Sequence, residues 1–264
     1  MTDQVCFEMP SDQRERLIRR HEFYVDQAKK RLILQFVEDE IRTEANNIGQ
    51  SYLDSNQSRY NPEAIGGDGI VEEAQDEMNE RYWMLADMRD SVRLSIISSI
   101  FHEWEKCLRQ WLVDEVSRWH HGDNTRDQIW RVNLEAQKGD NSILALLESF
   151  GWALRDFDFF KNLDACRLVV NVYKHGDGPS LTDLSKKYPE KYLEHPLGGP
   201  CEWLGEQWSY KHLNISDEDL DLFADAIKKF WKTLPEKVLD RQIEEPPSWL
   251  TKAIKQDREK KDIS

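Results

Sequence analysis

The sequence predicts an all-α fold, a helical bundle with long antiparallel helices and a loop-rich C-terminal third. Apolar residues recur at spacings of three to five over most of the chain, and we find neither strand-like alternation nor strand–helix–strand repetition. The chain has 264 residues, of which 39% are hydrophobic and 11% aromatic. This composition is ample for a core and excludes a disordered chain.

The N-terminal part is predicted to be a long amphipathic helix followed by a loop. Apolar residues recur over residues 11–51, with neither Pro nor Gly before Gly49. This pattern indicates one long helix or two consecutive pieces. Residues 55–69 are rich in Ser, Asn and Gly, which is typical of a polar loop, and we expect this loop to be mobile.

The remaining helices follow from periodicity together with cap and stop signals. Gly122 and Gly176 act as stops, Asn141 or Ser142 can cap a helix, and Ser216 begins a capping box. The expected helices cover residues 71–120, 125–137, 144–150, 158–175, 181–187, 216–235 and 248–259.

Pro and Gly interrupt residues 181–214, which predicts mostly irregular structure there. We divide the chain into an N-terminal helix and loop (1–78), a helical bundle (79–235) and a C-terminal helix with a charged tail (236–264).

The net charge of −14 disfavours nucleic-acid binding, because phosphates are repelled at long range. A local exception lies in residues 11–31, where seven basic residues stand against four acidic ones, a net of +3. No apolar run approaches the length of a membrane helix, and the N-terminus lacks the pattern of a signal peptide. We therefore expect a cytoplasmic protein with no membrane contact.

No metal site or cofactor is expected. The four cysteines form no C-x-x-C pair and are interpreted as reduced, mostly buried thiols. Adjacent His120 and His121 point about 100° apart on a helix, so we interpret them as a solvated helix end. The tryptophans at helical spacing are expected in the core, namely Trp83, Trp104, Trp111, Trp119 and Trp231. The tryptophans of the loop-rich C-terminal third could equally well cover a groove or pack under a loop, namely Trp203, Trp208 and Trp249.

A polar stripe on the helix predicted over 158–175 is the candidate site. At 100° per residue, its members fall within about one quadrant of an otherwise Val- and Leu-rich helix. They are Asp164, Arg167, Asn171, Lys174 and His175. A histidine with cations and an amide suits metal-independent RNA cleavage, in which a 2′-hydroxyl attacks its own phosphate. Equally, Lys174 and His175 could stabilise the helix C-terminus while Arg167 pairs with Asp164.

The helix that ends in Asn171-Val-Tyr-Lys-His175, preceded by two long helices and followed by a Gly-rich turn, resembles the HEPN superfamily. Ribonucleases of that superfamily, common in bacterial toxin–antitoxin and phage-defence systems, carry an R-x(4–6)-H motif whose Arg usually precedes a polar residue. The resemblance covers residues 79–235. Val170 stands where the family has Arg, and the nearest Arg, Arg167, lies eight residues before His175.

The resemblance implies a homodimer with a composite site that cleaves RNA without a metal. His175 would then be the general acid or base, Arg167 and Lys174 would bind the phosphate, and Asn171 would position the reacting group. The alternative is a catalytically inactive member that acts as a binding or regulatory subunit for an antitoxin or other protein partner.

Two further interpretations concern the surroundings of this site. Basic residues of the first helix could guide RNA toward it, namely Arg16, Arg19, Arg20 and Lys30. Glu103 could be a carboxylate of the active site. The sequence favours instead an exposed Glu103 that pairs with Lys106, three residues later.

Overall fold

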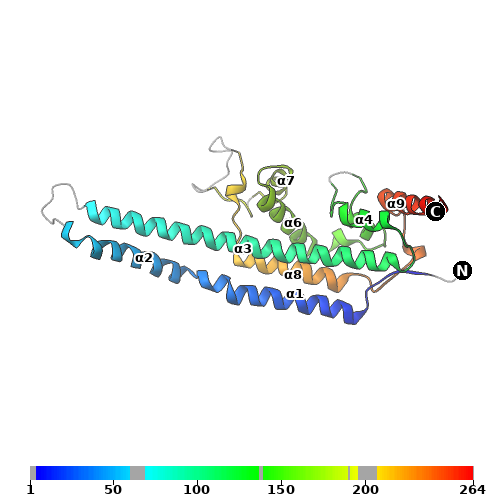
Figure 1. The fold of residues 1–264 in the computed structure, drawn as a ribbon, viewed down its shortest axis with the longest axis horizontal. Helices are drawn as coiled ribbons and strands as arrows, with labels where there is room; N and C mark the ends of the chain where they lie inside the picture. Colours follow the sequence, from blue (N-terminus) through cyan, green and yellow to red (C-terminus); the bar gives the residue numbers. More distant parts are fainter. Residues whose placement is uncertain (1–3, 60–68, 137–138, 190, 196–206, 264) are drawn as a thin grey trace.

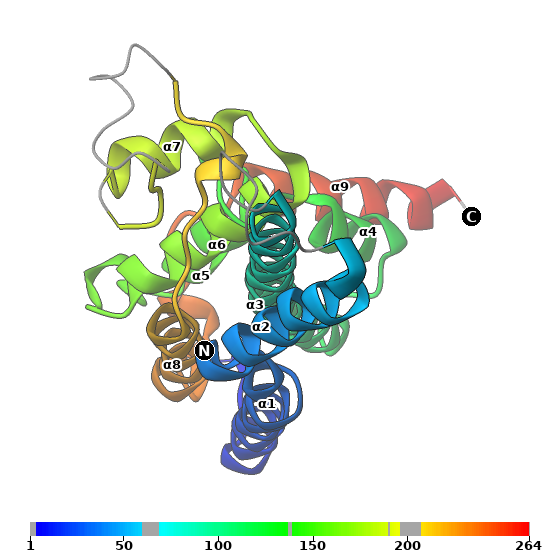
Figure 2. The same cartoon turned by 90° about the vertical axis from the view of Figure 1, so that its left-hand side faces the viewer.

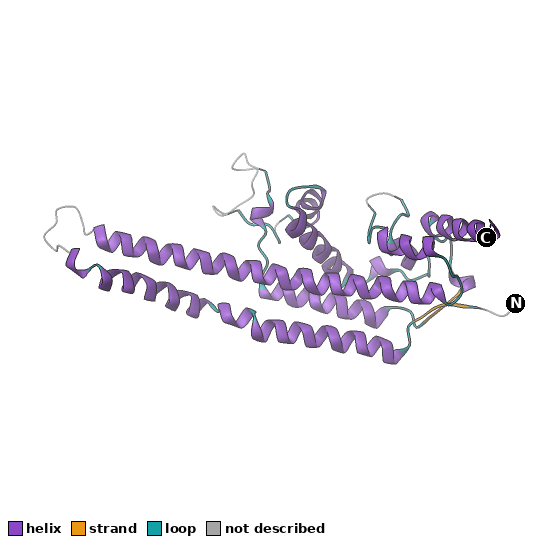
Figure 3. Cartoon of the chain, in the orientation of Figure 1, coloured by secondary structure: helices purple, strands orange, loops and turns teal. Residues whose placement is uncertain are grey.

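The computed structural model describes residues 4–59, 69–136, 139–189, 191–195 and 207–263. Helices make up most of it, which confirms the all-α prediction (Figure 3). The helices are α1 (Ser11–Arg31), α2 (Glu38–Ser55), α3 (Gly69–Ser117), α4 (Asp123–Arg131), α5 (Ile143–Glu148), α6 (Phe160–His175), α7 (Pro179–Lys187), α8 (Asp217–Thr233) and α9 (Ser248–Ile263), and the strands are β1 (Val5–Glu8) and β2 (Lys237–Leu239).

Three long helices form the frame of the molecule. The 49 residues of α3 would span about 70 Å at the rise of an α-helix. Helices α1 and α2 run antiparallel to it, one after the other (Figure 1). The short 3₁₀ helix Ile33–Phe36 separates them, so the first predicted helix is indeed in two pieces. Residues 60–68 of the predicted polar loop lie outside the described residues.

Helix α2 and residues 69–90 of α3 form an arm that extends beyond the other helices (Figure 1). The two helices approach closely at Gly49. A Cβ atom there would lie 3.1 Å from the carbonyl oxygen of Ala74 and 3.2 Å from the Cβ of Met78. Any side chain at position 49 would therefore push the helices of the arm apart.

The main core lies where the C-terminal half of α3 meets α6 and α8. The ring of Trp104 on α3 lies 5.0 Å from that of Phe230 on α8, which in turn lies 5.2 Å from Trp152. Trp104, Trp111 and Trp231 are buried as predicted, and Trp119 packs against the core. The prediction is wrong for Trp83, which is exposed on the arm, and Trp203 lies outside the described residues.

The two short strands were not predicted. They pair antiparallel as a small sheet between the two ends of the chain, and Phe7 and Val238 are buried in it. The indole Nε1 of Trp111 donates a hydrogen bond to the carbonyl oxygen of Glu8 at 2.9 Å. The indole Nε1 of Trp119 donates to the carbonyl oxygen of Cys6, also at 2.9 Å. Runs of four and three residues are too short to show a strand periodicity in the sequence.

The His120-His121 pair differs from its predicted solvated state. The side chain of His120 is only 8% exposed, and its Nε2 lies 3.2 Å from Oδ2 of Asp257 on α9. The contact joins residues 137 positions apart, so nothing local could indicate it. His121 is exposed, as expected.

The described cysteines are free thiols. Cys166 is fully buried, Cys6 and Cys107 are half-buried, and Cys201 lies outside the described residues. Burial raises the pKa of each of the three described thiols, so they are poor nucleophiles.

Helix α3 passes through the predicted boundary at residues 78 and 79 without a break, and β1 pairs with β2, so the parts 1–78 and 236–264 contact each other. The division into three parts stays a prediction. Within the described residues, no helix has both the length and the apolar character that spanning a membrane requires.

Candidate functional site on helix α6

Helix α6 carries the predicted polar stripe. Its apolar residues, such as Leu168, Val169 and Val172, are buried, and the helix contacts α3 and α8. The stripe runs from the buried Asp164 to the exposed end of the helix. The helix ends at Gly176, whose φ of 70° lies in the left-handed region that favours glycine. The predicted stop is therefore confirmed.

Arg167 is held between two carboxylates. Its Nη2 donates to Asp164 Oδ1 at 2.5 Å, and its Nε lies 3.4 Å from Glu135 Oε2. Its side chain is only 15% exposed. Lys187 on α7 also pairs with Asp164, at 2.7 Å. The pairing of Arg167 with Asp164, one of the two interpretations from sequence, is confirmed.

Asp164 is ionised in this arrangement. Burial raises its pKa, but the cations of Lys187 and Arg167 outweigh burial, and the net effect lowers the pKa below its ordinary value. The positive charge of Arg167 is thus largely compensated before any ligand arrives.

Arg167 and Asn171 line one polar groove of about 580 Å³. The groove is also lined by the basic residues Arg109 and Arg131 and by the acidic residues Glu105, Glu135 and Asp183. Three basic and three acidic side chains balance one another, so the groove is polar without a net preference for anions.

Arg109 is the lining residue that sequence reasoning missed. It is buried, pairs with Glu105 at 2.5 Å, and donates to the carbonyl oxygens of Ile129 and Val132 at 2.5 and 2.9 Å. A sequence signal existed, because Arg109 stands beside Leu108 on the apolar face of α3. Glu135, in the segment after α4, offered no such signal.

Lys174 and His175 lie beyond the groove, at the end of α6. Both are exposed, and neither side chain makes a hydrogen bond or ion pair within the described part of the chain. A hydrogen bond connects the end of α6 to α3, because the hydroxyls of Tyr173 and Ser95 are 3.0 Å apart. The structure thus brings Arg167 and Asn171 together in the groove and places Lys174 and His175 outside it, free to contact another molecule.

The predicted RNA-guiding residues are all exposed on α1, and each already has an acidic partner. The pairs are Arg16–Asp12 at 3.8 Å, Arg19–Glu15 at 3.5 Å, Arg20–Glu103 at 2.6 Å and Lys30–Asp26 at 2.8 Å. Helix α1 lies across α3 from α6 and α7, as two views show (Figures 1 and 2). The basic helix and the α6 stripe therefore do not form one continuous surface.

Glu103 is a surface residue, as the sequence favoured. Its Oε2 pairs with Lys106 at 2.8 Å, and its side chain is partly exposed. It lines a second, mostly apolar groove of about 700 Å³ between α1, α3 and α8. Because three helices distant in sequence form this groove, the sequence did not indicate it.

No group of three or more potential metal-ligating side chains occurs among residues 4–59, 69–136, 139–189, 191–195 and 207–263. No protein-family model matches the chain, and no curated protein or solved structure matches it significantly. Any function must therefore be argued from the geometry of the site itself.

Proposed function

We propose that this protein is a HEPN-like, metal-independent endoribonuclease of the bacterial toxin or phage-defence type, acting as a homodimer. The observation that carries the proposal is the end of α6, where Lys174 and His175 are exposed and unpaired one turn beyond Asn171. These side chains are available to a second molecule, whereas Arg167 is committed within the chain.

The chemistry requires two proton transfers and one site of negative charge. A 2′-hydroxyl attacks the adjacent phosphorus, the bond from phosphorus to the 5′ oxygen breaks, and the products are a 2′,3′-cyclic phosphate and a 5′-hydroxyl. One imidazole accepts the 2′ proton, and a second, protonated imidazole gives a proton to the leaving oxygen. Two copies of His175, one from each subunit, supply both groups without a metal.

The remaining residues of the stripe would bind rather than transfer protons. Lys174 offers an exposed ammonium for the phosphate, which gains negative charge in the transition state. Asn171 offers an amide that can hold a phosphate oxygen or the imidazole. Arg167 would orient this end of the groove through Asp164 and Glu135 and not contact the phosphate directly.

The compensated charge of Arg167 favours a second candidate function. With Arg167 paired to Asp164, and with no Arg next to Asn171, the chain could be a catalytically inactive HEPN-like subunit that binds a regulatory protein partner. The net charge of −14 also fits a protein that neutralises a basic partner.

The test is cleavage of total cellular RNA by the purified chain with EDTA present. We expect the wild type to cleave and His175→Ala to lose activity by about 100-fold or more. Because His175 is exposed, the melting temperature of the variant should stay unchanged.

His121→Ala is the matched control, since His121 is also exposed and lies near the far end of α3. It should leave cleavage unchanged. Absence of cleavage by the wild type would reject the ribonuclease and favour the binding subunit, and equal cleavage by His175→Ala would reject the assigned site.

A further inference from the structure

An exposed apolar strip lies on the outer side of the arm. Trp83, Met84 and Met88 on α3 are 64%, 51% and 54% exposed. On a helix, Met84 and Met88 are about 40° apart and Trp83 is about 100° from Met84, so the three side chains share one side. Large apolar side chains that cluster in this way mark interaction sites far more often than isolated ones do.

Only acidic residues accompany this strip. Asp76, Glu77, Glu80 and Asp87 fall within the same sector of about 140°, and all four are exposed. None of the four makes an ion pair within the described residues. We call this set, together with Trp83, Met84 and Met88, the Trp83 face.

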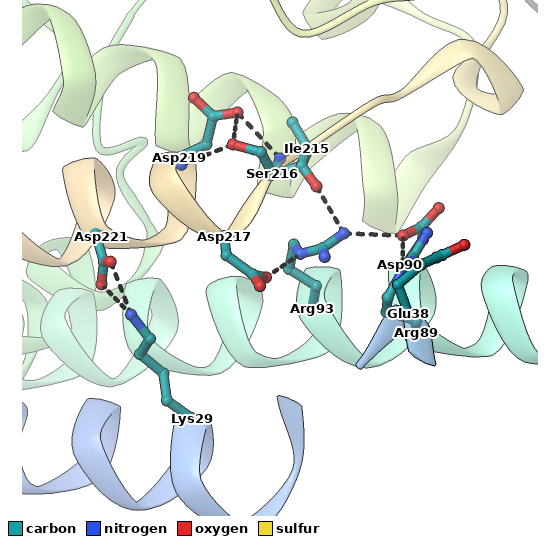
Figure 4. Close-up of polar contacts among 10 residues, drawn as sticks. All are labelled: Lys29, Glu38, Arg89, Asp90, Arg93, Ile215, Ser216, Asp217, Asp219 and Asp221. Carbon is teal, nitrogen blue, oxygen red and sulfur yellow. Dashed lines mark hydrogen bonds and ion pairs between the residues drawn. The ribbon is translucent and has the colours of Figure 1, made fainter. Parts of the chain in front are cut away.

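The cations of the same stretch point elsewhere. Arg81 pairs with Glu44 on α2, and Arg89 with Glu38 on α2 at 3.1 Å. Arg93 pairs with Asp217 on α8 at 2.6 Å (Figure 4). The arginines are used to attach α3 to its neighbours, and the Trp83 face is left with an apolar centre and uncompensated negative charge.

The negative charge and the apolar centre of the Trp83 face indicate which kind of molecule can bind there. Nucleic acid is repelled by the carboxylates, and the same face of a second copy would oppose like charges. The basic helix α9 of the same chain lies at the opposite end of the molecule from the arm (Figure 1). Electrostatic complementarity therefore requires a cationic partner, and the apolar strip requires one with an apolar side.

We propose that the Trp83 face docks a cationic amphipathic helix of a partner protein. Trp83 is the anchor that such a helix would bury, and tryptophan is among the residues that contribute most to binding energy at interfaces. The flexible side chains of Met84 and Met88 adapt to the apolar side of the incoming helix. The four carboxylates would attract its Lys and Arg residues and set its orientation. This docking does not depend on the proposed RNA cleavage.

The test uses a synthetic 18-residue amphipathic helix of leucine and lysine as the probe, titrated calorimetrically into the full chain. A peptide of the same pattern with glutamate in place of lysine is the control. We expect the lysine peptide to bind, the glutamate peptide not to bind, and the affinity to fall with added salt.

Variants assign the binding to the face. Trp83→Ser should weaken binding about tenfold or more, and so should the combined change Glu77→Gln, Glu80→Gln and Asp87→Asn. Phe23→Ser is the matched control, because Phe23 is 67% exposed on α1, away from the arm. It should leave the affinity unchanged.

The proposal would be overturned by no binding of the lysine peptide, by equal binding by the Trp83→Ser chain, or by equal binding of both peptides. Self-association in sedimentation that disappears in Trp83→Ser would also overturn it, because a second copy would then cover the face. Peptide binding by His175→Ala should match the wild type, which keeps this test separate from that of RNA cleavage.

Discussion

Asp257 on α9 accepts two hydrogen bonds through Oδ2 from Thr125 on α4, one from the backbone nitrogen at 2.9 Å and one from the hydroxyl at 2.7 Å. Its other oxygen accepts from the backbone and side-chain nitrogens of Asn124, both at 2.9 Å. The N-cap residue of α4, Gly122, has no side chain with which to satisfy these groups. The last helix of the chain thus supplies the cap of a helix 132 residues earlier.

Removal of this carboxylate should destabilise the protein. We expect Asp257→Ala to lower the free energy of unfolding by about 3 kcal/mol, because it leaves the buried donors of Thr125 and the half-buried donors of Asn124 without their acceptor. Glu259→Ala, at an exposed position on the same helix, should change it by less than about 0.5 kcal/mol. Chemical denaturation measures both, and equal effects would contradict a capping role.

The same carboxylate should contribute to acid sensitivity. Burial raises the pKa of Asp257, but the hydrogen bonds from Thr125, Asn124 and His120 outweigh burial and bring the pKa below its ordinary 3.8. The unfolded chain therefore takes up this proton first as the pH falls. The stabilisation is complete above about pH 5 and is lost as the pH falls through the folded pKa. The difference in stability between wild type and Asp257→Asn should shrink over that acid range.

Gly122 should not tolerate a side chain. A Cβ there would lie 2.0 Å from Asp257 Oδ2 and 2.1 Å from its Cγ, and that carboxylate is held by its own hydrogen bonds. We expect Gly122→Ala to lower the melting temperature clearly. Gly178→Ala, where nothing lies within 4 Å of the added Cβ, is the control and should have little effect. A harmless Gly122→Ala would show that α9 can move away from α4.

His21 should make stability depend on pH near neutrality. Its Nε2 lies 2.9 Å from the carbonyl oxygen of Ala224 on α8, and burial lowers the pKa of His21 below 6.5, while Lys228 adds to the effect and Glu22 opposes it. The unfolded state therefore binds the proton more readily, so stability should be full above about pH 7 and fall as the pH drops through 6.5. His21→Gln should have a flatter profile between pH 7 and 5 by chemical denaturation. Parallel profiles for the two proteins would exclude this role.

Arg167 and Lys174 should behave differently although both lie on α6. Arg167→Ala leaves Asp164 with Lys187 as its only close cation and Glu135 with Arg155, and we expect a loss of about 2 kcal/mol. Lys174→Ala removes an exposed, unpaired ammonium and should change stability by less than about 0.5 kcal/mol. If Lys174 binds phosphate, its variant should instead weaken RNA cleavage. Thermal unfolding and cleavage assays separate the two roles.

Two of the ion pairs drawn in Figure 4, Arg93–Asp217 and Lys29–Asp221, should contribute unequally to stability. Arg93 is buried, pairs with Asp217 at 2.6 Å and donates to the carbonyl oxygen of Ile215 at 2.8 Å, so Arg93→Ala should cost about 3 kcal/mol. Lys29 and Asp221 form a partly exposed pair at 2.7 Å, and Lys29→Ala should cost no more than about 1 kcal/mol. Urea titrations of both variants test this order, and a reversed order would contradict it.

The parts of the fold that were predicted correctly depend on neighbouring residues. Ser142 caps α5 by accepting from the backbone nitrogen of Ala145 at 3.1 Å, and Ser216 forms the predicted capping box with Asp219. Gly176 ends α6 in the left-handed region. Each of these signals acts within about four residues, and the printed sequence therefore contains it completely.

The candidate site could be predicted only in part for the same reason. The sequence placed Arg167, Asn171, Lys174 and His175 on one side of a helix, because helical geometry follows from spacing. It did not indicate that Glu135 would approach Arg167, since that contact joins residues 32 positions apart through the packing of separate elements. This contact gives Arg167 a second carboxylate besides Asp164, the local partner that the sequence already offered.

By itself, the sequence determined the all-α class, the caps and ends of several helices and the polar stripe of α6, because periodicity and capping are local properties of the chain. Only the tertiary structure decided that β1 pairs with β2, that Asp257 caps α4 and that Trp83 stays exposed on the arm. An apolar residue at helical spacing is buried only where another element covers it. The covering element comes from elsewhere in the chain, and the outer side of the arm has none among the described residues.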